Sequence, residues 1–266
     1  MATLLMCFDA PMQSWGTRSH FASRDTATEP TKSGVTGLLA AALGIPRDAD
    51  DKIKTLADLR MGVRVDREGV VEDDFHTVQN VPNTEGKNHR TATTRRFYLA
   101  DALFLVGLET DDTQLLHQML DALMRPRWPL YFGRKAFVPS RPIPSNGFPE
   151  ERHPITGKTL GDALRTHPWL ENQATPHFQE RTRPQEAPGT WLRTIVDADP
   201  LALDVELRHD HPLSFGPQQR SYAPRAVHIS HVPLTPEMIN DGAAAQTGLP
   251  TTGDAPQPHT THRDGP

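Results

Sequence analysis

The pattern of apolar positions predicts two buried strands and two amphipathic helices in the first 126 residues. Residues 4–8 form a continuous apolar run and residues 98–108 are strongly apolar, as expected of buried strands. In residues 35–43 and 113–126, apolar side chains recur every three or four positions, as they do on one face of a helix. We therefore expect each strand to be followed by a helix that packs against it.

Residues at the ends of both helices support this assignment. The run Asp111-Asp112-Thr113 supplies N-cap chemistry to the second helix, and Pro126 ends it. Gly44 stands where a left-handed C-cap residue would end the first helix, and Pro46 prevents the helix from continuing. The first helix is thus predicted to end at Gly44 and the second at Pro126.

Two hairpins and a further short strand complete the predicted domain. Residues 61–72 alternate as a strand, turn at Arg67-Glu68-Gly69 and restart, which predicts a hairpin. Residues 76–97 have a polar, Thr-rich centre at 83–94 between apolar flanks and predict a long projecting hairpin. A short strand begins at Pro129. The order corresponds to the ferredoxin-like β-α-β-β-α-β (RRM-like) plan of an α+β domain with an inserted hairpin.

Composition changes after residue 140. We predict a ferredoxin-like domain over 1–140 and a smaller β-rich part over 141–235, with one short helix after Gly157 and strands over 191–198, 201–210 and the stretch before Pro233. Residues 236–266 are rich in Gly, Pro, Thr and Ala and poor in large apolar residues, so they predict a disordered tail.

The charges are segregated along the chain. The net charge is −5, which on average disfavours a free-standing nucleic-acid binder. Acidic residues are nevertheless absent from long windows that each carry Lys or Arg, and this segregation fits one polyanion-facing side with other faces reserved for protein partners. A chance distribution over solvated loops is the alternative. The acid-free windows are residues 30–47, 87–100, 122–149 and 211–236.

A single cysteine, Cys7, excludes a disulfide framework and fits a reducing cytosol. No apolar run approaches the ~20 residues of a membrane span, so a soluble cytoplasmic protein is expected. His209 and His211 could share a strand face, but no ligand motif of fixed spacing accompanies them. We therefore predict neither a metal nor a cofactor.

The start of the first helix, Pro30 to Gly34, is a candidate phosphate site because helix N-termini bind anions and Lys32, Ser33 and Gly34 are placed there. Trp15 and Phe97 offer planes for stacking single-stranded bases, although a core role for Trp15 is equally compatible with the sequence. The predicted RNA-binding residues are Gln13, Trp15, Arg18, Lys32, Ser33, Gly34, Arg95, Arg96, Arg134, Lys135, Arg220 and Arg225, and the predicted hairpin-tip residues are Lys87, Asn88, His89 and Arg90.

Two other functions compete with RNA binding. Metal-free RNA cleavage needs a base for a ribose 2′-hydroxyl and an acid or cation for the leaving group. The candidates by residue type are His20, His76, Tyr131 and Lys135. The structural alternatives are that His76 is a polar hairpin residue and that Tyr131 is a half-buried strand aromatic. A module that contacts only proteins is the other competitor.

Several separated motifs together resemble the CasD family, the CRISPR-associated members of the RAMP superfamily found in type I-E Cascade. The resemblance covers roughly residues 1 to 235. The motifs are APMQSWG, PTKSGVTGLLAAALGI, DFHTVQ, RRFYLADALFLVGLE, RPRWPLYFGRKAFVPSRP and SFGPQQRSYAPRAV.

This resemblance implies a modified ferredoxin-like RNA-binding domain with an inserted hairpin, or thumb, over residues 87–96. It implies a subunit that binds and caps the 5′ handle of crRNA, with Lys32, Ser33 and Gly34 near the handle. The implied partners are the Cascade backbone subunit, the large PAM-recognising subunit and target DNA near its PAM-proximal end. Type I-E members are expected to lack catalysis, whereas a type I-C relative cuts repeat RNA, so a metal-independent endoribonuclease remains the alternative.

Overall fold

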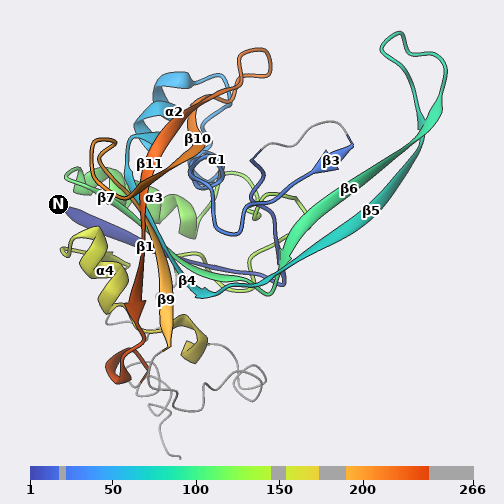
Figure 1. The fold of residues 1–266 in the computed structure, drawn as a ribbon. Helices are drawn as coiled ribbons and strands as arrows, with labels where there is room; N and C mark the ends of the chain where they lie inside the picture. The colour runs from blue at the N-terminus through green and yellow to red at the C-terminus, as the bar shows by residue number, and fades with distance from the viewer. Residues whose placement is uncertain (18–21, 145–153, 174–189, 240–266) are drawn as a thin grey trace, which may run out of the picture.

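A computed structural model describes residues 1–17, 22–144, 154–173 and 190–239 of the chain. Its body is a seven-stranded antiparallel sheet with the order β10-β11-β9-β4-β7-β1-β8 (Figure 1). The strands are β1 (Ala2–Asp9), β4 (Arg60–Arg67), β7 (Leu103–Thr110), β8 (Ile155–Thr156), β9 (Trp191–Asp197), β10 (Val205–Ser214) and β11 (Ser221–Pro233).

The predicted ferredoxin-like plan is confirmed in the strands β8-β1-β7-β4. Helix α1 (Lys32–Leu43) and the short α2 (Asp50–Ala57) connect β1 to β4, and α3 (Thr113–Met124) follows β7. The predicted caps are also confirmed, because Gly44 has φ 71° and the Asp112 side chain accepts a hydrogen bond from the Leu115 amide. The fourth strand was predicted in the wrong place: residues after Pro129 form a loop, and the two-residue β8 pairs with β1.

Helices cover both faces of the sheet, which explains why β1 is apolar at consecutive positions. Leu4, Met6 and Phe8 belong to the core that includes α1 and α3. Leu5 and Cys7 face the opposite side, where α4 (Leu160–Thr166) packs through Leu160 and Leu164. A 3₁₀ helix (Leu170–Gln173) follows α4.

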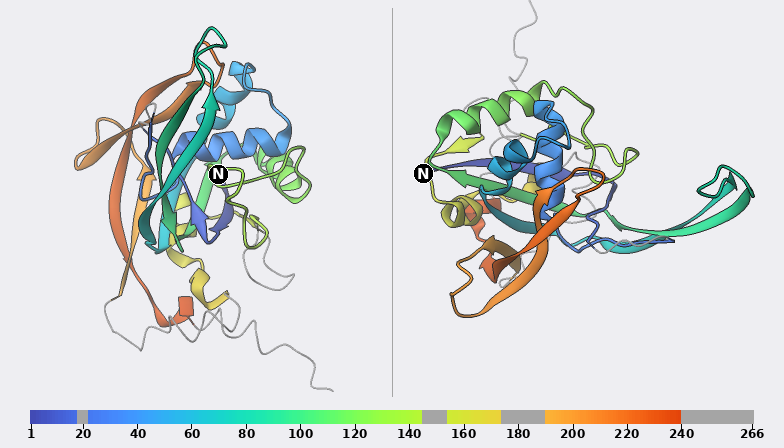
Figure 2. Two further views of the ribbon diagram at one scale, coloured as in Figure 1. Left: turned by 90° about the vertical axis from the view of Figure 1, so that its right-hand side faces the viewer. Right: turned by 90° about the horizontal axis from the view of Figure 1, so that it is seen from above.

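A second sheet carries a long hairpin away from the body (Figures 1 and 2). Its strands β5 (Val70–Val81) and β6 (Arg90–Ala100) pair in antiparallel fashion, and β2 (Met12–Gln13) and β3 (Ser23–Arg24) also pair with β6. The predicted projecting hairpin is therefore confirmed, with strands that extend beyond residues 76–97.

The predicted hairpin over residues 61–72 is wrong. A turn does occur, with Gly69 at φ 71°, but β4 pairs with β7 and β9 while β5 pairs with β6. The turn therefore moves the chain from one sheet to the other. The reason lies in burial, because β4 is buried along most of its length whereas β5 is exposed along most of its length. The strand predicted over residues 98–108 is also shared between the two sheets, because the chain turns at Asp101, which has φ 57°. Residues up to Ala100 belong to β6, and residues from Leu103 belong to β7.

The C-terminal part extends the main sheet across residue 140, because β9 pairs directly with β4. Strand β9 matches its prediction, and the strand predicted over 201–210 lies at 205–214. Met238 is buried against Trp169 and Leu192, so the first residues of the predicted tail are packed. Residues 240–266 of that predicted tail lie outside the described residues.

In the part of the chain that the structure describes, no helix combines the length and apolar character needed to cross a membrane.

Candidate nucleic-acid interface

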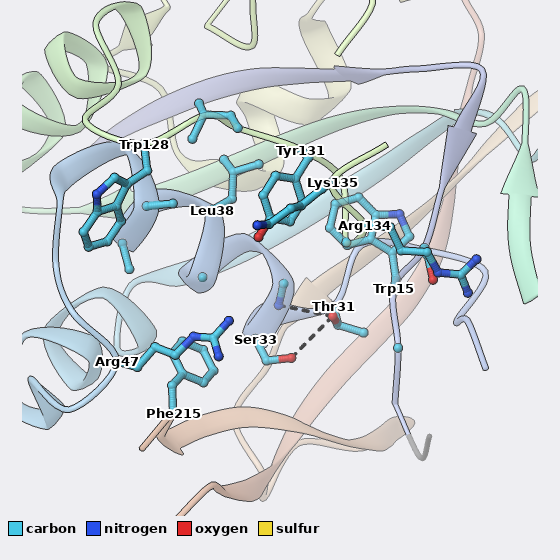
Figure 3. A pocket seen from close by; sticks show the side chains of 18 of the residues that line it. Trp15, Thr31, Ser33, Leu38, Arg47, Trp128, Tyr131, Arg134, Lys135 and Phe215 are labelled. Atoms are coloured by element: carbon cyan, nitrogen blue, oxygen red, sulfur yellow. Dashed lines mark hydrogen bonds between the residues drawn. The ribbon is translucent and has the colours of Figure 1, made fainter. Parts of the chain in front are cut away.

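A cleft of about 990 Å³ lies beside α1. Its walls come from the start of α1, from β3 and β6 at the root of the hairpin, from the loop at 128–135 and from the loop between β10 and β11 (Figure 3). Six cations and five aromatic residues line it, against one carboxylate, Asp25. The cations are Arg24, Arg47, Arg96, Arg134, Lys135 and Arg220, and the aromatic residues are Trp15, Trp128, Tyr131, Phe215 and Tyr222.

The acid-free windows of the sequence converge at this cleft. Window 30–47 contributes Arg47, window 87–100 contributes Arg96, window 122–149 contributes Arg134 and Lys135, and window 211–236 contributes Arg220. Among the described residues, none of the six lining cations forms an ion pair with a carboxylate. The fold thus gathers positive charge from segments far apart in the sequence.

Arg134 is held in place by the backbone of β6. Its guanidinium donates to the carbonyl of Phe97 at 2.6 Å and to that of Arg96 at 3.4 Å, and it lies over the Phe137 ring at 5.3 Å from the centroid. Burial, together with the charge of Arg96, lowers the pKa of Arg134. An anion entering the cleft would relieve this repulsion between like charges.

A tight loop at 131–135 positions Tyr131 and Lys135. The buried Phe132 packs against Phe8 with ring centroids 4.8 Å apart, and its carbonyl accepts a hydrogen bond from the Ser14 amide at 3.1 Å. Gly133 has φ 88°, and a Cβ there would lie 1.9 Å from the Ser14 carbonyl oxygen. Only glycine fits this close approach, so the loop is anchored on the segment after β1.

The start of α1 is not the open anion site that the sequence predicted. The Lys32 side chain is buried and pairs with Asp197 at 2.6 Å, and the Lys32 amide donates to Asp210 at 2.8 Å. Asp210 therefore supplies the negative charge that a helix N-terminus favours. The structure gives Lys32 a structural role in place of the predicted phosphate contact.

Arg225 belongs to the same buried group. Its guanidinium pairs with Asp210 at 2.7 Å and also with Asp197. We refer to Lys32, Asp197, Asp210 and Arg225 as the charge cluster. Arg225 pairs with both carboxylates and the Lys32 ammonium pairs with Asp197, so both cations have internal partners and the structure gives Arg225 a structural role as well, in place of the predicted RNA contact.

Ser33 and Gly34 do lie at the cleft, but they have internal partners as well. The Gly34 amide donates to Thr31 Oγ1 at 3.2 Å, and the Ser33 hydroxyl lies 3.4 Å from the same oxygen. A Cβ on Gly34 would lie 2.8 Å from the Trp15 ring, so this glycine lets the helix pack on the indole.

Gln13 and Trp15 form the framework beneath the cleft. Gln13 donates to the carbonyls of Phe8 at 3.2 Å and Ala102 at 2.8 Å, and it accepts from Trp15 Nε1 at 3.2 Å. Both side chains are buried, and the Trp15 indole stacks on Phe8. The core role considered for Trp15 is the one observed, and Gln13 joins it there.

Arg95 and the hairpin tip lie apart from the cleft. Successive side chains of β6 point to opposite faces, so Arg96 lines the cleft and Arg95 does not. The exposed Arg95 pairs with Asp73 at 2.9 Å and lies over the Phe97 ring. The predicted tip residues lie at the far end of the hairpin (Figure 2), with Lys87, Asn88 and His89 in the turn after β5 and Arg90 at the start of β6. Arg18 and His20 lie outside the described residues.

The candidates for acid–base catalysis are only partly brought together. Tyr131 and Lys135 both line the cleft, whereas His76 lies on β5 and contacts Asp74 at 2.7 Å. No histidine is found among the described lining residues. Within the described parts of the chain, His, Cys, Asp and Glu side chains form no group of three that could hold a metal ion.

Sequence analysis missed several lining residues. Phe215 and Arg47 lie at one end of the cleft and Arg134 at the other (Figure 3). The signal for most of them was available, because Arg47 belongs to an acid-free window and the motifs RPRWP and SFGPQQRSY contain the three missed aromatic residues. Arg24 gave no such signal, since Asp25 and Glu29 follow it closely. The missed residues are Arg24, Arg47, Trp128, Phe215 and Tyr222.

Comparison with known proteins agrees with the motifs. The family described as CRISPR-associated protein (Cas5) matches residues 3–228. The chain is 34% identical over 154 residues to the CRISPR system Cascade subunit CasD of Escherichia coli K12, a match that covers 53% of this chain and 68% of CasD.

Solved structures agree as well. A crystal structure described as a Cas protein has a TM-score of 0.62 at 38% identity and covers 87% of this chain and 95% of its own. A chain of a CRISPR RNA-guided surveillance complex has a TM-score of 0.68 at 29% identity, with 91% and 98% covered. The predicted resemblance is therefore confirmed, and the chain belongs to the Cas5 family of CRISPR-associated proteins.

Proposed function

We propose that this protein is a non-catalytic subunit of a type I-E Cascade surveillance complex, in which its cleft binds and caps the 5′ handle of crRNA. In that complex it links the backbone subunit to the large PAM-recognising subunit, near the PAM-proximal end of the target DNA. The cleft, with six cations and one carboxylate, is the observation that carries the proposal. The similarity to E. coli CasD and to a chain of a surveillance complex supports the assignment of the complex.

The chemistry of the cleft matches single-stranded RNA. Phosphates bind Lys and Arg, and unstacked bases bind aromatic rings, so a single-stranded segment needs both groups side by side. Trp128, Tyr131, Phe215 and Tyr222 supply the rings around the cations. A protein partner would have to present both carboxylates and apolar surface to match this lining.

The arrangement also reconciles RNA binding with a net charge of −5. Many cations elsewhere are neutralised by carboxylates within the fold, so they do not contribute to an RNA surface. These paired cations are Lys32, Arg60, Arg64, Arg67, Arg141, Arg193, Arg208 and Arg225. Local charge in the cleft, rather than the average, then determines RNA affinity.

The binding test uses labelled repeat RNA and the double variant Lys135→Ala/Arg220→Ala. We expect the variant to bind at least about tenfold more weakly, and the slope of log affinity against log salt to fall by about 0.7 for each phosphate that the variant no longer neutralises. Arg165→Ala is the matched control, because Arg165 is an exposed cation on α4, on the opposite face of the sheet. Equal affinities for the two variants would contradict the proposed cleft.

The endoribonuclease alternative has a separate test. Tyr131 and Lys135 share the cleft, so they are the residues on which cleavage would depend. Incubation of the protein with repeat RNA in EDTA is expected to leave the RNA intact. Discrete cleavage that disappears in Tyr131→Phe would replace the non-catalytic assignment with the nuclease.

A further inference from the structure

The turn between β9 and β10, residues 198–204, carries the two most exposed large apolar side chains of the described residues. Leu201 is 92% exposed and Leu203 is 88% exposed, and Leu207 at the start of β10 is 61% exposed. Single exposed apolar residues are ordinary on a protein surface. Three leucines within seven residues instead form a patch of the kind that marks interaction sites. We refer to the three as the leucine knob.

The backbone of this turn is well defined. The Asp199 side chain accepts from the Leu201 amide at 2.8 Å, and the Asp199 carbonyl accepts from the Ala202 amide at 2.9 Å. Asp204 closes the turn in the left-handed region, with φ 59°. A partner that buries Leu201 and Leu203 would therefore have little backbone to order, which favours binding.

Leu207 is adjacent to the turn across β11. Ala226 of β11 accepts a hydrogen bond from the Ala198 amide at 3.0 Å and is paired in register with Leu207. Ala198, the first residue of the turn, and Leu207 thus lie on opposite sides of Ala226. The turn and the start of β10 therefore lie close together in the fold, with β11 between them.

The segment that carries the leucine knob is acidic, although Arg208, the residue that follows it, pairs with Glu206 at 2.7 Å. Residues 198–207 contain Asp199, Asp204 and Glu206 and no Lys, Arg or His. Carboxylates repel phosphates, so nucleic acid is a poor occupant. The complementary partner is a protein surface with an apolar centre and Lys or Arg at its rim.

The leucine knob is also separate from the cleft. The turn extends from the side of the sheet opposite to the β5–β6 hairpin in Figures 1 and 2. None of its residues lines the cleft. A partner bound there would leave both the cleft and the hairpin accessible.

We propose that the leucine knob is a docking site for another protein subunit of the complex, one that presents an apolar socket with a basic rim. The inference rests on the proposed membership of a Cascade complex. It adds a protein-binding surface that is distinct from the RNA cleft, so RNA and the subunit are held at the same time by different chemistry.

The test co-expresses the chain with the other Cascade subunits of its own organism and with crRNA, and measures subunit retention by native mass spectrometry during dilution. The double variant Leu201→Ser/Leu203→Ser is expected to hold one protein subunit at least about tenfold more weakly, as for the removal of a buried interface anchor. Its binding of repeat RNA should equal that of the wild type. Leu213→Ser, which alters an exposed leucine at the other end of β10, should behave as the wild type.

A second variant tests the acidic rim without altering the leucines. Asp204→Asn removes one charge and keeps a residue that tolerates the left-handed backbone. We expect severalfold slower association at low salt and no difference at high salt. This variant also decides the result if the double-serine variant fails to fold.

The outcomes separate the two proposals. Wild-type retention of every subunit in the double-serine variant, or wild-type association of Asp204→Asn at low salt where the double-serine variant fails to fold, would overturn the docking site and leave the RNA proposal intact. A wild-type chain that assembles with no subunit and no crRNA would overturn both. Dissociation of one subunit with unchanged RNA binding would establish the docking site.

Discussion

The charge cluster and the cleft both adjoin the first turn of α1, and both contain basic residues. In the cluster, Lys32 and Arg225 are buried and each contacts carboxylates of Asp197 or Asp210. In the cleft, six cations face a single carboxylate, and among the described residues none of the six has an acidic partner. The difference shows that a cation's partners, rather than its presence at a helix start, decide whether it can bind RNA.

The cluster also joins two parts of the chain that are distant in sequence. Asp210 of β10 accepts from the Lys32 amide at the start of α1, and the loop that follows β10 supplies Phe215 and Arg220 to the cleft. The cluster therefore supports the cleft wall without contacting RNA. Stability and RNA affinity should respond separately to changes in the two regions.

The largest expected effect comes from the cluster. Asp210→Ala leaves Lys32 and Arg225 buried with one carboxylate between them, and breaking a buried pair in this way costs about 3–5 kcal/mol of unfolding free energy. Urea denaturation followed by far-UV circular dichroism measures this change. Asp162→Ala, which removes an exposed carboxylate on α4, should change stability by less than about 0.5 kcal/mol.

Salt should affect the two regions differently. Between 50 and 200 mM salt, RNA affinity is expected to fall steeply, because each phosphate contact with a single strand contributes about −0.7 to the slope of log affinity against log salt. The unfolding free energy should change little, since buried pairs are screened much less than exposed ones. Parallel titrations of RNA binding and urea unfolding check this contrast, which a salt-insensitive RNA affinity would contradict.

The smallest expected effect is a pH dependence beside the cluster. Burial, followed by the charge of Lys32, lowers the pKa of His211, although Asp58 lies 3.7 Å away and opposes the shift. Since the folded pKa lies below the ordinary value, the unfolded chain binds the proton first. The unfolding free energy should therefore fall as pH falls below about 6.5, until the folded pKa is passed.

His211→Gln removes this titration. Its unfolding free energy should be less sensitive to pH over the range below about 6.5 than that of the wild type. Urea midpoints at a series of pH values compare the two proteins. Identical pH profiles would show that His211 does not contribute.

Much of the fold could be predicted from local signals. The apolar run at 4–8, the helix at 113–124 and its Asp112 cap needed no tertiary information. The turn at Gly69 was also visible, but the sequence does not indicate that the strands on its two sides enter different sheets. That outcome depends on long-range pairing of β4 with β9, more than 120 residues away in the chain.

The candidate site was predictable by region more than by residue. Acid-free windows located five of the six cleft cations, because a segment without Asp or Glu has no nearby carboxylate to pair with its own cations. The same windows contain Lys32 and Arg225, whose partners Asp197 and Asp210 come from outside them. Partners so far away in the chain could not be inferred from the local sequence.

The central claim is that the cleft holds the 5′ end of crRNA, and ultraviolet cross-linking of the assembled complex tests it most directly. Peptides that contain Trp128, Tyr131, Phe215 or Tyr222 should cross-link to nucleotides of the 5′ handle. Excess unlabelled handle RNA should not displace the crRNA from a preformed complex. Cross-links confined to other faces of the protein, with none from these four rings, would contradict the account.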